Sequence, residues 1–355
     1  MRRLRVGVVG CGRVAQQAHL PVLARDRRVE LIALAESDEA QLRAAARHAP
    51  RAALFADWRE LFERSDVEAL IICLPNALHA EAARAALALG RHVYLEKPVA
   101  TNLADARAVV EAWRRAPHAV GMLGFNYRFN RLYEGARAHV HAGRLGELIS
   151  ARTIFSTAEG EGQPAWKRVR AQGGGALLDL GSHHVDLLRF VFDREVREVS
   201  AQIWSRHAED DCAALQLRLD GGLTVQSLFS TCAVEEDGLE VYGSAGKLSF
   251  DRYRSTPPPR LSNATLRGAR LNQLGHALGA LRHGAYSLEK LRAPAREPSF
   301  TKALGAFVSA ALTGERDAKP DLEDGFRSLE VIDAAERSAR ERRVVAVATD
   351  DSRAG

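Results

Sequence analysis

The sequence predicts an α/β protein with an N-terminal doubly wound parallel sheet and a C-terminal α+β domain whose sheet is mainly antiparallel. Three observations carry this prediction. Strand-like apolar runs alternate with helix-like segments in the first half of the chain, and the first run ends in a glycine turn. After about residue 126, strand-like runs instead follow one another across hairpin-type turns. The first pattern favours parallel strands with helices on both faces, and the second favours antiparallel pairing.

The first half supplies the alternating elements in order. The expected strands are Leu4–Val9, Val29–Ala35, Ala69–Leu74, His92–Leu95 and Ala119–Leu123, and the expected helices are Gln17–Arg25, Glu39–Arg47, Ala77–Leu89 and Leu103–Arg114. Because 355 residues exceed what one hydrophobic core usually serves, we expect two domains. We place them at residues 1–125 and 126–348, with C-terminal helices that are free to pack back on the first domain. A flexible tail is expected at 349–355.

The second half changes its pattern. A helix is expected at Leu132–Ala142, a strand at Leu148–Thr157 and a helix after Gly173-Gly174-Gly175. Further strands are expected at Val196–Trp204, Ala213–Leu219, Leu223–Ser230 and Leu239–Tyr242, with Asp220-Gly221-Gly222 as a hairpin turn between the second and third of these. Residues 255–294 are expected to form a loop and an irregular helix. Amphipathic helices are expected at Ser299–Leu312 and Leu322–Glu341.

Composition excludes several classes of function. The formal charge is +5, but the basic residues form no dense block with interleaved aromatic residues, which argues against a nucleic-acid partner. No apolar stretch is long enough to span a bilayer, so no membrane role is expected. The four cysteines, Cys11, Cys73, Cys212 and Cys232, are far apart in sequence and show no CxxC spacing. This usage favours a reduced, cytoplasmic protein.

The segment Gly10-Cys11-Gly12-Arg13-Val14-Ala15 lies between the first strand and the first helix. Gly10 permits a tight turn, Gly12 lets the backbone approach a pyrophosphate, and the small Ala15 lets the helix pack on the strand. The N-terminus of the helix then presents unpaired N–H groups to phosphate. In this context the turn predicts a dinucleotide-binding site, although the motif alone would also suit a simple strand–helix connection.

An acidic residue at the end of the second strand selects the cofactor. Glu36 would accept hydrogen bonds from the adenosine ribose and repel a 2′-phosphate, which favours NAD over NADP. Asp38 competes for this role. NADP stays open as an alternative because Arg13 would tolerate a phosphate.

Polar residues also follow the later strands of the parallel sheet, at the edge where ligands bind in such folds. Leu74-Pro75-Asn76 and His79 follow the third expected strand; Asn76 would bind the cofactor or cap the next helix. Glu96-Lys97-Pro98 follows the fourth, where a lysine would stabilise developing alkoxide charge on a substrate hydroxyl. Asn126 follows the last strand and is expected to border the site.

Asp179 and His183 follow the glycine triplet and lie four residues apart, on one face of a helix. A histidine can take the proton of a hydroxyl as hydride leaves, and a carboxylate nearby would stabilise the charged imidazole. A purely structural pair fits the same spacing. His184 adjoins His183, but adjacent helical residues point to different faces and ligate one ion poorly, so no metal is expected. Trp166, Lys167 and Arg128 are candidates for contact with substrate.

These motifs together resemble the Gfo/Idh/MocA family (glucose–fructose oxidoreductase, inositol dehydrogenase and rhizopine catabolism). The resemblance rests on the glycine turn with His19-Leu20-Pro21, on Leu74-Pro75-Asn76 with His79, on Glu96-Lys97-Pro98, on 124–129 (GFNYRF), on 173–183 (GGGALLDLGSH) and on 334–338 (AAERS). It implies an N-terminal Rossmann domain and an open C-terminal sheet that makes a homodimer or homotetramer. It also implies that Lys97 is the catalytic lysine and that Asp179 and His183 complete the site.

The function that follows is an NAD(P)-dependent oxidoreductase. We expect hydride transfer between the nicotinamide and a secondary alcohol of a sugar, cyclitol or sugar derivative, with His183 as proton acceptor or donor and Lys97 as the polarising group. Two alternatives stay open: a dinucleotide-binding regulator without turnover, and another chemistry on the same fold, either reduction of an imine or unsaturated substrate or a redox-neutral reaction.

Overall fold

The computed structural model describes residues 2–64, 66–158, 163–263 and 284–348. The chain forms two compact units, one made of Met1–Asn126 with Arg292–Leu329 and the other of Tyr127–Leu291 with Glu330–Gly355. Helix α11 (Leu322–Glu341) therefore contributes residues to both. The expected tail at 349–355 lies outside the described residues.

The described part of the first unit contains a six-stranded parallel sheet with the order β3-β2-β1-β4-β5-β6. This order characterises a Rossmann fold, in which ligands bind where the strand order reverses. The strands are β1 (Leu4–Val9), β2 (Val29–Ala35), β3 (Ala53–Phe55), β4 (Ala69–Ile72), β5 (His92–Leu95) and β6 (Gly121–Leu123). The helices are η1 (Ala15–His19), α1 (Leu20–Arg25), α2 (Glu39–Ala46), α3 (Trp58–Phe62), η2 (Asn76–Leu78), α4 (His79–Ala88), α5 (Leu103–Arg114), η9 (Pro294–Arg296) and α10 (Ser299–Thr313).

The strands of this sheet are buried, which explains their continuous apolar runs. Val6, Val8 and Val9 of β1 are inaccessible to solvent, and every residue of β4 is at most 1% exposed. Polar side chains cap the covering helices: Asp38 accepts a hydrogen bond from the Gln41 amide at the start of α2. Strand β3 and helix α3 were not predicted, because segments of three and five residues are too short to show a period.

The second unit is built on an eight-stranded mixed sheet, counted over its described residues, with the order β13-β12-β11-β7-β10-β9-β8-β14. Only the β10–β7 pair is parallel among the described pairs of this sheet. The strands are β7 (Leu148–Ser156), β8 (Val196–Trp204), β9 (Cys212–Leu219), β10 (Thr224–Ser230), β11 (Glu236–Gly243), β12 (Gly246–Asp251), β13 (Arg260–Asn263) and β14 (Val345–Ala346). The helices are η3 (Asn126–Phe129), α6 (Arg131–His141), η5 (Ala165–Arg168), η6 (Arg170–Gln172), η7 (Leu177–Gly181), α7 (Ser182–Phe192), η8 (Asp220–Gly222) and α9 (Gly284–Arg292).

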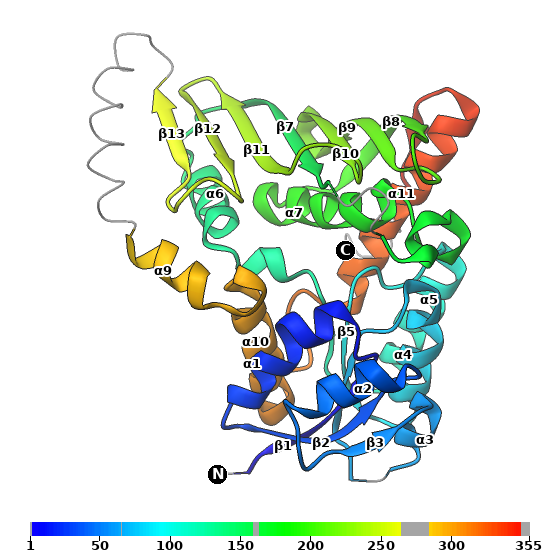
Figure 1. Cartoon of the computed structure of the whole chain (residues 1–355). Helices are drawn as coiled ribbons and strands as arrows, with labels where there is room; N and C mark the ends of the chain where they lie inside the picture. The colour runs from blue at the N-terminus through cyan, green and yellow to red at the C-terminus, as the bar shows by residue number, and fades with distance from the viewer. Residues whose placement is uncertain (1, 65, 159–162, 264–283, 349–355) are drawn as a thin grey trace. The chain divides into compact units, whose positions relative to one another are not determined.

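Helices α6 and α7 lie along the same face of this sheet (Figure 1). Side chains alternate between buried and exposed along β9 and β10, so the opposite face stays open. The predicted hairpin between β9 and β10 is confirmed, with Thr224 opposite Arg218. Strands β12, β13 and β14 were not predicted. The expected loop and helix at 255–294 fall in part on 264–283, outside the described residues.

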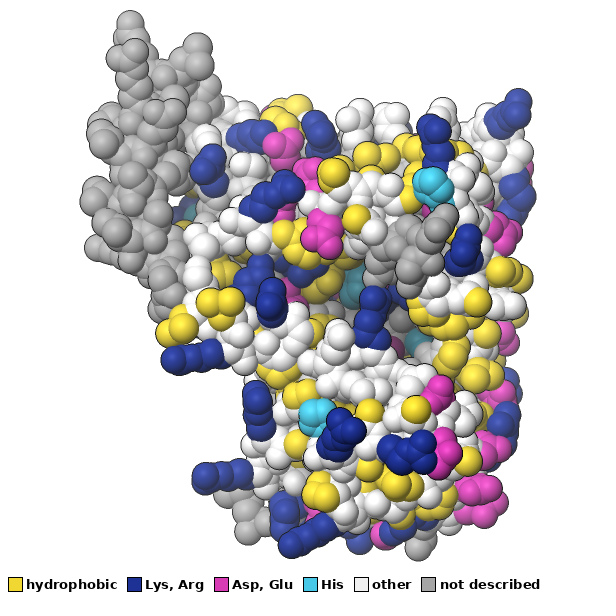
Figure 2. All heavy atoms as spheres, viewed as in Figure 1, with side chains coloured by type: hydrophobic (Ala, Val, Ile, Leu, Met, Phe, Trp, Pro, Cys, Tyr) yellow, Lys and Arg dark blue, Asp and Glu magenta, His cyan; other side chains and the backbone are white. Residues whose placement is uncertain are grey.

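The predicted fold class is confirmed, with a parallel sheet first and a mainly antiparallel sheet second. Within the described ranges no helix has the length and apolarity that crossing a bilayer requires. Figure 2 shows Lys and Arg side chains scattered among acidic and hydrophobic ones on the visible face, as the sequence predicted for a charge that is spread rather than concentrated.

Candidate active site

The glycine turn lies between β1 and η1, at the carboxyl edge of the first sheet. Gly10 has φ +82°, and a Cβ there would lie 2.6 Å from the carbonyl carbon of Cys73, so only glycine fits. A Cβ on Gly12 would meet only the Gln41 side chain, at 3.7 Å. Backbone at Gly12 is thus approachable. Ala15 is fully buried and begins a π-helical turn, a feature that is frequent at functional sites.

Glu36 reaches the glycine turn. One carboxylate oxygen accepts a hydrogen bond from the Cys11 amide at 2.8 Å, and the other accepts from the Asp38 amide at 3.1 Å. Asp38 has a different task, because its side chain caps α2. The competition between these two acidic residues therefore favours Glu36 as the one beside the turn. Burial raises the pKa of the Cys11 thiol to about 12, with the Glu36 charge adding to the effect.

His79 connects the loops that follow β4 and β5. Its Nδ1 lies 2.7 Å from the Pro98 carbonyl oxygen and its Nε2 lies 2.8 Å from the Leu74 carbonyl oxygen. Burial lowers the pKa of His79, and the two carbonyl contacts oppose that shift. The structure therefore gives His79 a positioning contact to backbone on each side. Asn76 belongs to the segment that follows β4 and is buried at the start of η2.

Lys97 stands at the end of β5, next to a buried carboxylate. Glu96 accepts hydrogen bonds from the Lys97 amide at 3.2 Å and contacts His19 Nε2 at 2.7 Å. Although burial opposes ionisation, the His19 contact lowers the pKa of Glu96 below its ordinary value. A Cβ on Gly124 would lie 2.9 Å from this carboxylate, so the end of β6 also approaches it closely. The Lys97 side chain is half-buried.

Asn126 was expected to border the cofactor. Its side chain is buried and donates a hydrogen bond to Ser299 Oγ at 2.8 Å, at the start of α10. This contact joins the end of the sheet to a helix that follows much later in the chain.

In the second unit, Asp179 and His183 lie in consecutive helical segments, η7 and α7. The turn that holds Asp179 is π-helical rather than α-helical, which the sequence did not predict. Asp179 accepts from Lys167 Nζ at 2.7 Å. The His183 ring stacks on Tyr127, with ring centroids 4.5 Å apart and planes inclined by 30°.

The glycine triplet explains how Lys167 reaches Asp179. Gly173 and Gly175 have positive φ, and a Cβ on Gly174 would lie 2.1 Å from the Lys167 carbonyl oxygen. The backbone of η5 therefore packs directly on the triplet. The sequence analysis assigned Lys167 to substrate and Asp179 to the catalytic group, and the structure brings these two together. Trp166 is half-buried, with the Lys167 ammonium 5.8 Å from its ring centre.

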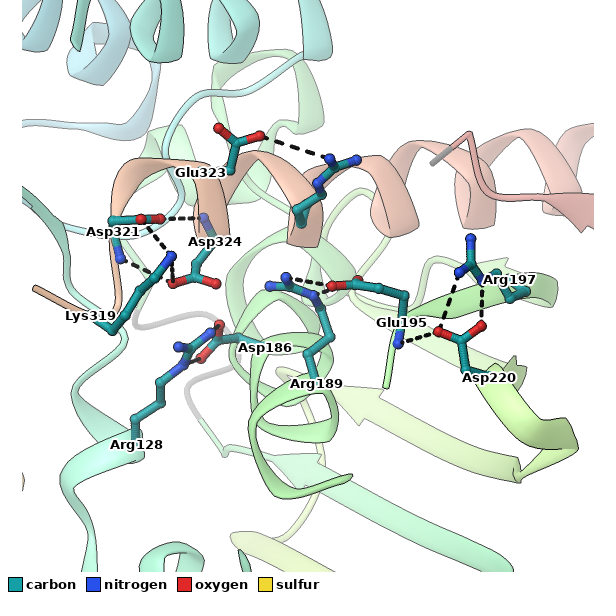
Figure 3. Close-up of polar contacts among 11 residues, drawn as sticks. Arg128, Asp186, Arg189, Glu195, Arg197, Asp220, Lys319, Asp321, Glu323 and Asp324 are labelled. Carbon is teal, nitrogen blue, oxygen red and sulfur yellow. Dashed lines mark hydrogen bonds and ion pairs between the residues drawn. The ribbon is translucent and has the colours of Figure 1, made fainter. Parts of the chain in front are cut away.

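Three ionic contacts lie on or next to α7. Arg128 forms an ion pair with Asp186, which is 1% exposed, and the two side chains face each other in Figure 3. Asp237 is fully buried; it accepts from Tyr133 Oη at 2.8 Å and pairs with Arg252 and His184. Burial opposes ionisation of Asp237, but the Arg252 charge and the His184 contact hold its pKa well below the ordinary value.

The comparisons with known proteins agree with this architecture. A family model described as an oxidoreductase family with an NAD-binding Rossmann fold matches residues 4–123, and the GFO/IDH/MocA C-terminal domain matches residues 133–249. Streptomyces violaceoruber dTDP-3,4-didehydro-2,6-dideoxy-alpha-D-glucose 3-reductase is 32% identical over 72% of this chain and 75% of its own length.

This chain belongs to the GFO/IDH/MocA oxidoreductase family.

Other known proteins match nearly the whole chain. Myo-inositol 2-dehydrogenase of Thermotoga maritima is 27% identical over 96% of this chain and 98% of its own length. The crystal structure of GenD2 from gentamicin A biosynthesis, in complex with NAD, has a TM-score of 0.82 at 25% identity, covering 98% of this chain and 97% of that one. The resemblance in the sequence and the prediction of an NAD(P)-dependent enzyme are thus confirmed.

Sequence reasoning missed several residues of this GFO/IDH/MocA protein that hold the candidate groups. Tyr127 lay in a matching motif, but nothing in the sequence paired it with His183. The Arg252 guanidinium lies 4.1 Å from the Tyr127 ring centre, and its carboxylate partner is Asp237. These residues are separated by long stretches of sequence, so only the tertiary fold brings them together. His184, weighed as a metal ligand, instead contacts Asp237.

Proposed function

We propose that this enzyme transfers hydride between NAD(H) and a secondary alcohol of a sugar, cyclitol or sugar derivative. The proposal rests on two side chains of this GFO/IDH/MocA chain. Lys97 follows β5, where its amide donates a hydrogen bond to Glu96, and His183 lies on α7, four residues after Asp179. Each group has a side chain suited to one part of the reaction. Names of relatives refer to inositol and deoxysugar substrates, which supports this substrate class.

The roles follow from the chemistry of the side chains. In oxidation, His183 takes the proton of the hydroxyl while the carbon–hydrogen bond breaks with its electron pair, leaving a carbonyl group. The Lys97 ammonium stabilises the negative charge that develops on the oxygen. In reduction, His183 returns the proton to that oxygen. Tyr127 holds the imidazole plane by stacking, and Lys167 fixes the position of the Asp179 carboxylate by pairing with it.

The first unit suits a bound dinucleotide. Gly12 leaves its backbone approachable, and the Glu36 carboxylate accepts from the Cys11 amide within the glycine turn, which supports a contact of Glu36 with the ribose. When bound, the nicotinamide supplies the hydride acceptor or donor. Gly10, Gly12, Arg13, Val14 and Ala15 would hold the pyrophosphate, Glu36 the adenosine ribose, and Leu74, Pro75, Asn76, His79, Glu96, Lys97 and Asn126 the nicotinamide end. We propose NAD as the preferred cofactor because Glu36 places a negative charge where NADP carries a phosphate.

Substrate selection would fall to the second unit. Trp166 offers an apolar ring and Lys167 a charge already shared with Asp179. Arg128 is committed to Asp186, so we assign it to positioning of α7 as well as to bordering the substrate.

The test is a substrate panel. Purified protein is mixed with NAD⁺ and inositols, aldoses and deoxysugars, and nicotinamide absorbance is followed. His183→Asn is expected to lower kcat by about 10²–10⁴-fold, and Lys97→Met by a comparable factor, with NADH binding retained by fluorescence. Lys247→Met, at a surface lysine of β12 paired with Glu240, is the matched control and should keep full activity.

The same experiment separates the alternatives. Tight NADH binding without turnover of any polyol or keto-sugar would favour a dinucleotide-binding regulator. Product that forms without net change in nicotinamide absorbance would favour a redox-neutral reaction. Full activity of Lys97→Met would overturn the role given to that lysine.

We also propose a homodimer or homotetramer through the open face of the second sheet. Gln216, Gln226 and Leu228 project from β9 and β10 on that face, and Leu228 is 39% exposed. Arg152, Ser200 and Gln202 belong to the same depression on the sheet. Light scattering of the wild type and of Leu228→Glu tests this interface; loss of the oligomer in the variant is expected. A cytoplasmic location accompanies the proposal, since the cysteines are all free.

A further inference from the structure

Two cysteines that are far apart in sequence meet at one end of the second sheet. Cys212 begins β9, and Cys232 lies two residues beyond the end of β10. Their Sγ atoms are 3.7 Å apart. Ser230, the residue opposite Cys212 in the β9–β10 pair, places its Oγ 3.4 Å from both sulfurs. The three side chains form a compact thiol–hydroxyl–thiol cluster.

The two sulfurs differ in accessibility. Cys212 is 6% exposed, and burial raises the pKa of its thiol to about 11. Cys232 is half-exposed and lies outside the strand, so a small reagent meets it first. Cys11 is fully buried, and burial raises the pKa of its thiol to about 12. Cys73 is half-exposed, but desolvation raises the pKa of its thiol well above the ordinary value, which lowers its reactivity.

Asp211 adjoins this cluster, but both of its carboxylate oxygens already accept hydrogen bonds from backbone amides. One oxygen accepts from the Arg206 amide at 2.8 Å, and the other accepts from the amides of His207 and Ala208 at 2.7 and 3.0 Å. Ligation of a metal by this carboxylate would compete with these three hydrogen bonds. The sulfur pair is thus better suited to reaction between its own members than to a cation.

We propose that Cys212 and Cys232 are a peroxide-sensitive modification site that forms an intramolecular disulfide. The Cys232 thiol loses its proton, and the thiolate attacks hydrogen peroxide. The oxygen–oxygen bond breaks, a sulfenic acid forms, and the departing hydroxide takes up a proton to become water. The Cys212 sulfur then attacks the sulfenic sulfur, the S–S bond forms, and a second water leaves. Two thiols are oxidised and one peroxide is reduced. Ser230 Oγ lies 3.4 Å from both sulfurs, within hydrogen-bonding reach of each, and keeps the two side chains together.

The cluster is connected to the segment that carries Lys167. Asp211 holds residues 206–208, the Glu209 amide donates to the Arg168 carbonyl oxygen, and the Arg170 amide donates to the Glu209 carboxylate. Oxidation at Cys212 would therefore restrain residues 206–209, which hold η5 and η6 through these hydrogen bonds. This inference does not depend on the proposed hydride transfer, because the bond itself is the readout.

The experiment counts thiols in the full-length protein. Reduced protein is treated with one equivalent of hydrogen peroxide, quenched with catalase, unfolded in the presence of N-ethylmaleimide and weighed by mass spectrometry. The wild type is expected to take two labels instead of four and to have lost two hydrogens. Peptide mapping should place the link between Cys212 and Cys232, and dithiothreitol should restore four labels.

Single variants make the result specific. Cys212→Ser should leave a sulfenic acid at Cys232 that dimedone traps, and Cys232→Ser should resist oxidation. Cys11→Ser is the matched control, and it should still lose two thiols. Four labels after oxidation, a link that includes Cys11 or Cys73, or stoichiometric Zn²⁺ binding that shields Cys212 and Cys232 in place of a disulfide would overturn the proposal.

Discussion

The two units hold their candidate groups in different ways. In the first unit, the groups stand at strand ends and contact backbone: Glu36 accepts from the Cys11 amide, His79 meets two carbonyl oxygens, and Glu96 accepts from the Lys97 amide. In the second unit, side chains hold side chains: Lys167 pairs with Asp179, Arg128 with Asp186 and Arg252 with Asp237.

This difference has a physical origin. A parallel sheet brings all its carboxyl ends to one edge, so backbone groups are available there in a fixed pattern. A helix lying on an antiparallel sheet has its backbone hydrogen bonds satisfied internally, so its polar side chains must find partners on other elements. Figure 3 shows the result for Arg128 and Asp186, and for the more exposed pairs of Arg189 with Glu195 and Arg197 with Asp220.

We expect the largest effect from a substitution that breaks the buried contact between Asp237 and Arg252. Asp237→Ala leaves the Arg252 charge buried without its carboxylate, and we expect a loss of about 3–5 kcal/mol in the free energy of unfolding. Urea denaturation followed by circular dichroism measures it. Asp220→Ala removes the exposed partner of Arg197 and should cost only about 0–1 kcal/mol. Equal midpoints for the two variants would contradict the importance given to the buried network.

The next effect concerns backbone in the first unit. Gly10→Ala forces a Cβ against the Cys73 carbonyl at positive φ, and we expect a loss of about 2–3 kcal/mol together with weaker NADH binding. Gly90→Ala is the matched control, since Gly90 also has positive φ but a Cβ there meets nothing within 4 Å. It should cost about 1 kcal/mol. Thermal unfolding with and without NADH distinguishes them.

We expect a smaller effect from removing the charge of Glu36, which tests the proposed preference for NAD over NADP. Glu36→Gln keeps a side chain of similar size but removes its charge, so the ratio of kcat/KM for NAD⁺ over NADP⁺ should fall by about tenfold, as expected for one charged hydrogen bond. Asp38→Asn should leave the ratio unchanged, because Asp38 caps α2. If Asp38→Asn shifts the ratio and Glu36→Gln does not, the assignment of the ribose contact is wrong.

The smallest expected effect is on how the free energy of unfolding depends on pH in the acid range. The pKa of Glu96 is lower in the folded protein than its ordinary value of 4.5, so its ionisation stabilises the fold above that pH. This contribution declines as pH falls below about 4.5 toward the folded pKa. Glu96→Gln should therefore flatten the dependence of the unfolding midpoint between pH 5 and about 3, whereas Glu39→Gln, on the exposed surface of α2, should not. If the unfolding midpoints of Glu96→Gln and the wild type depend on pH in the same way, the stabilising role given to Glu96 ionisation is wrong.

The sequence by itself determined the alternating strands, the glycine turn, the Glu-Lys-Pro segment and the glycine triplet, because each depends on local periodicity or on conformations that few residues adopt. It therefore predicted the fold class and the family. The sequence did not predict the short β3, the edge strands β13 and β14, or β12, which lies next to β13, because their pairing is decided by neighbours rather than by their own pattern.

Only the tertiary structure decided which side chains meet. In the first unit, Glu36 accepts from the Cys11 amide and Asp38 caps a helix. In the second unit, Asp179 pairs with a lysine and Tyr127 stacks on His183. Cys212 and Cys232 come close together at the ends of the β9–β10 hairpin. Such contacts depend on strand register and helix docking, since a shift of one residue turns a side chain to the opposite face. Residue type and spacing specify the local turns, whereas long-range packing specifies the partners.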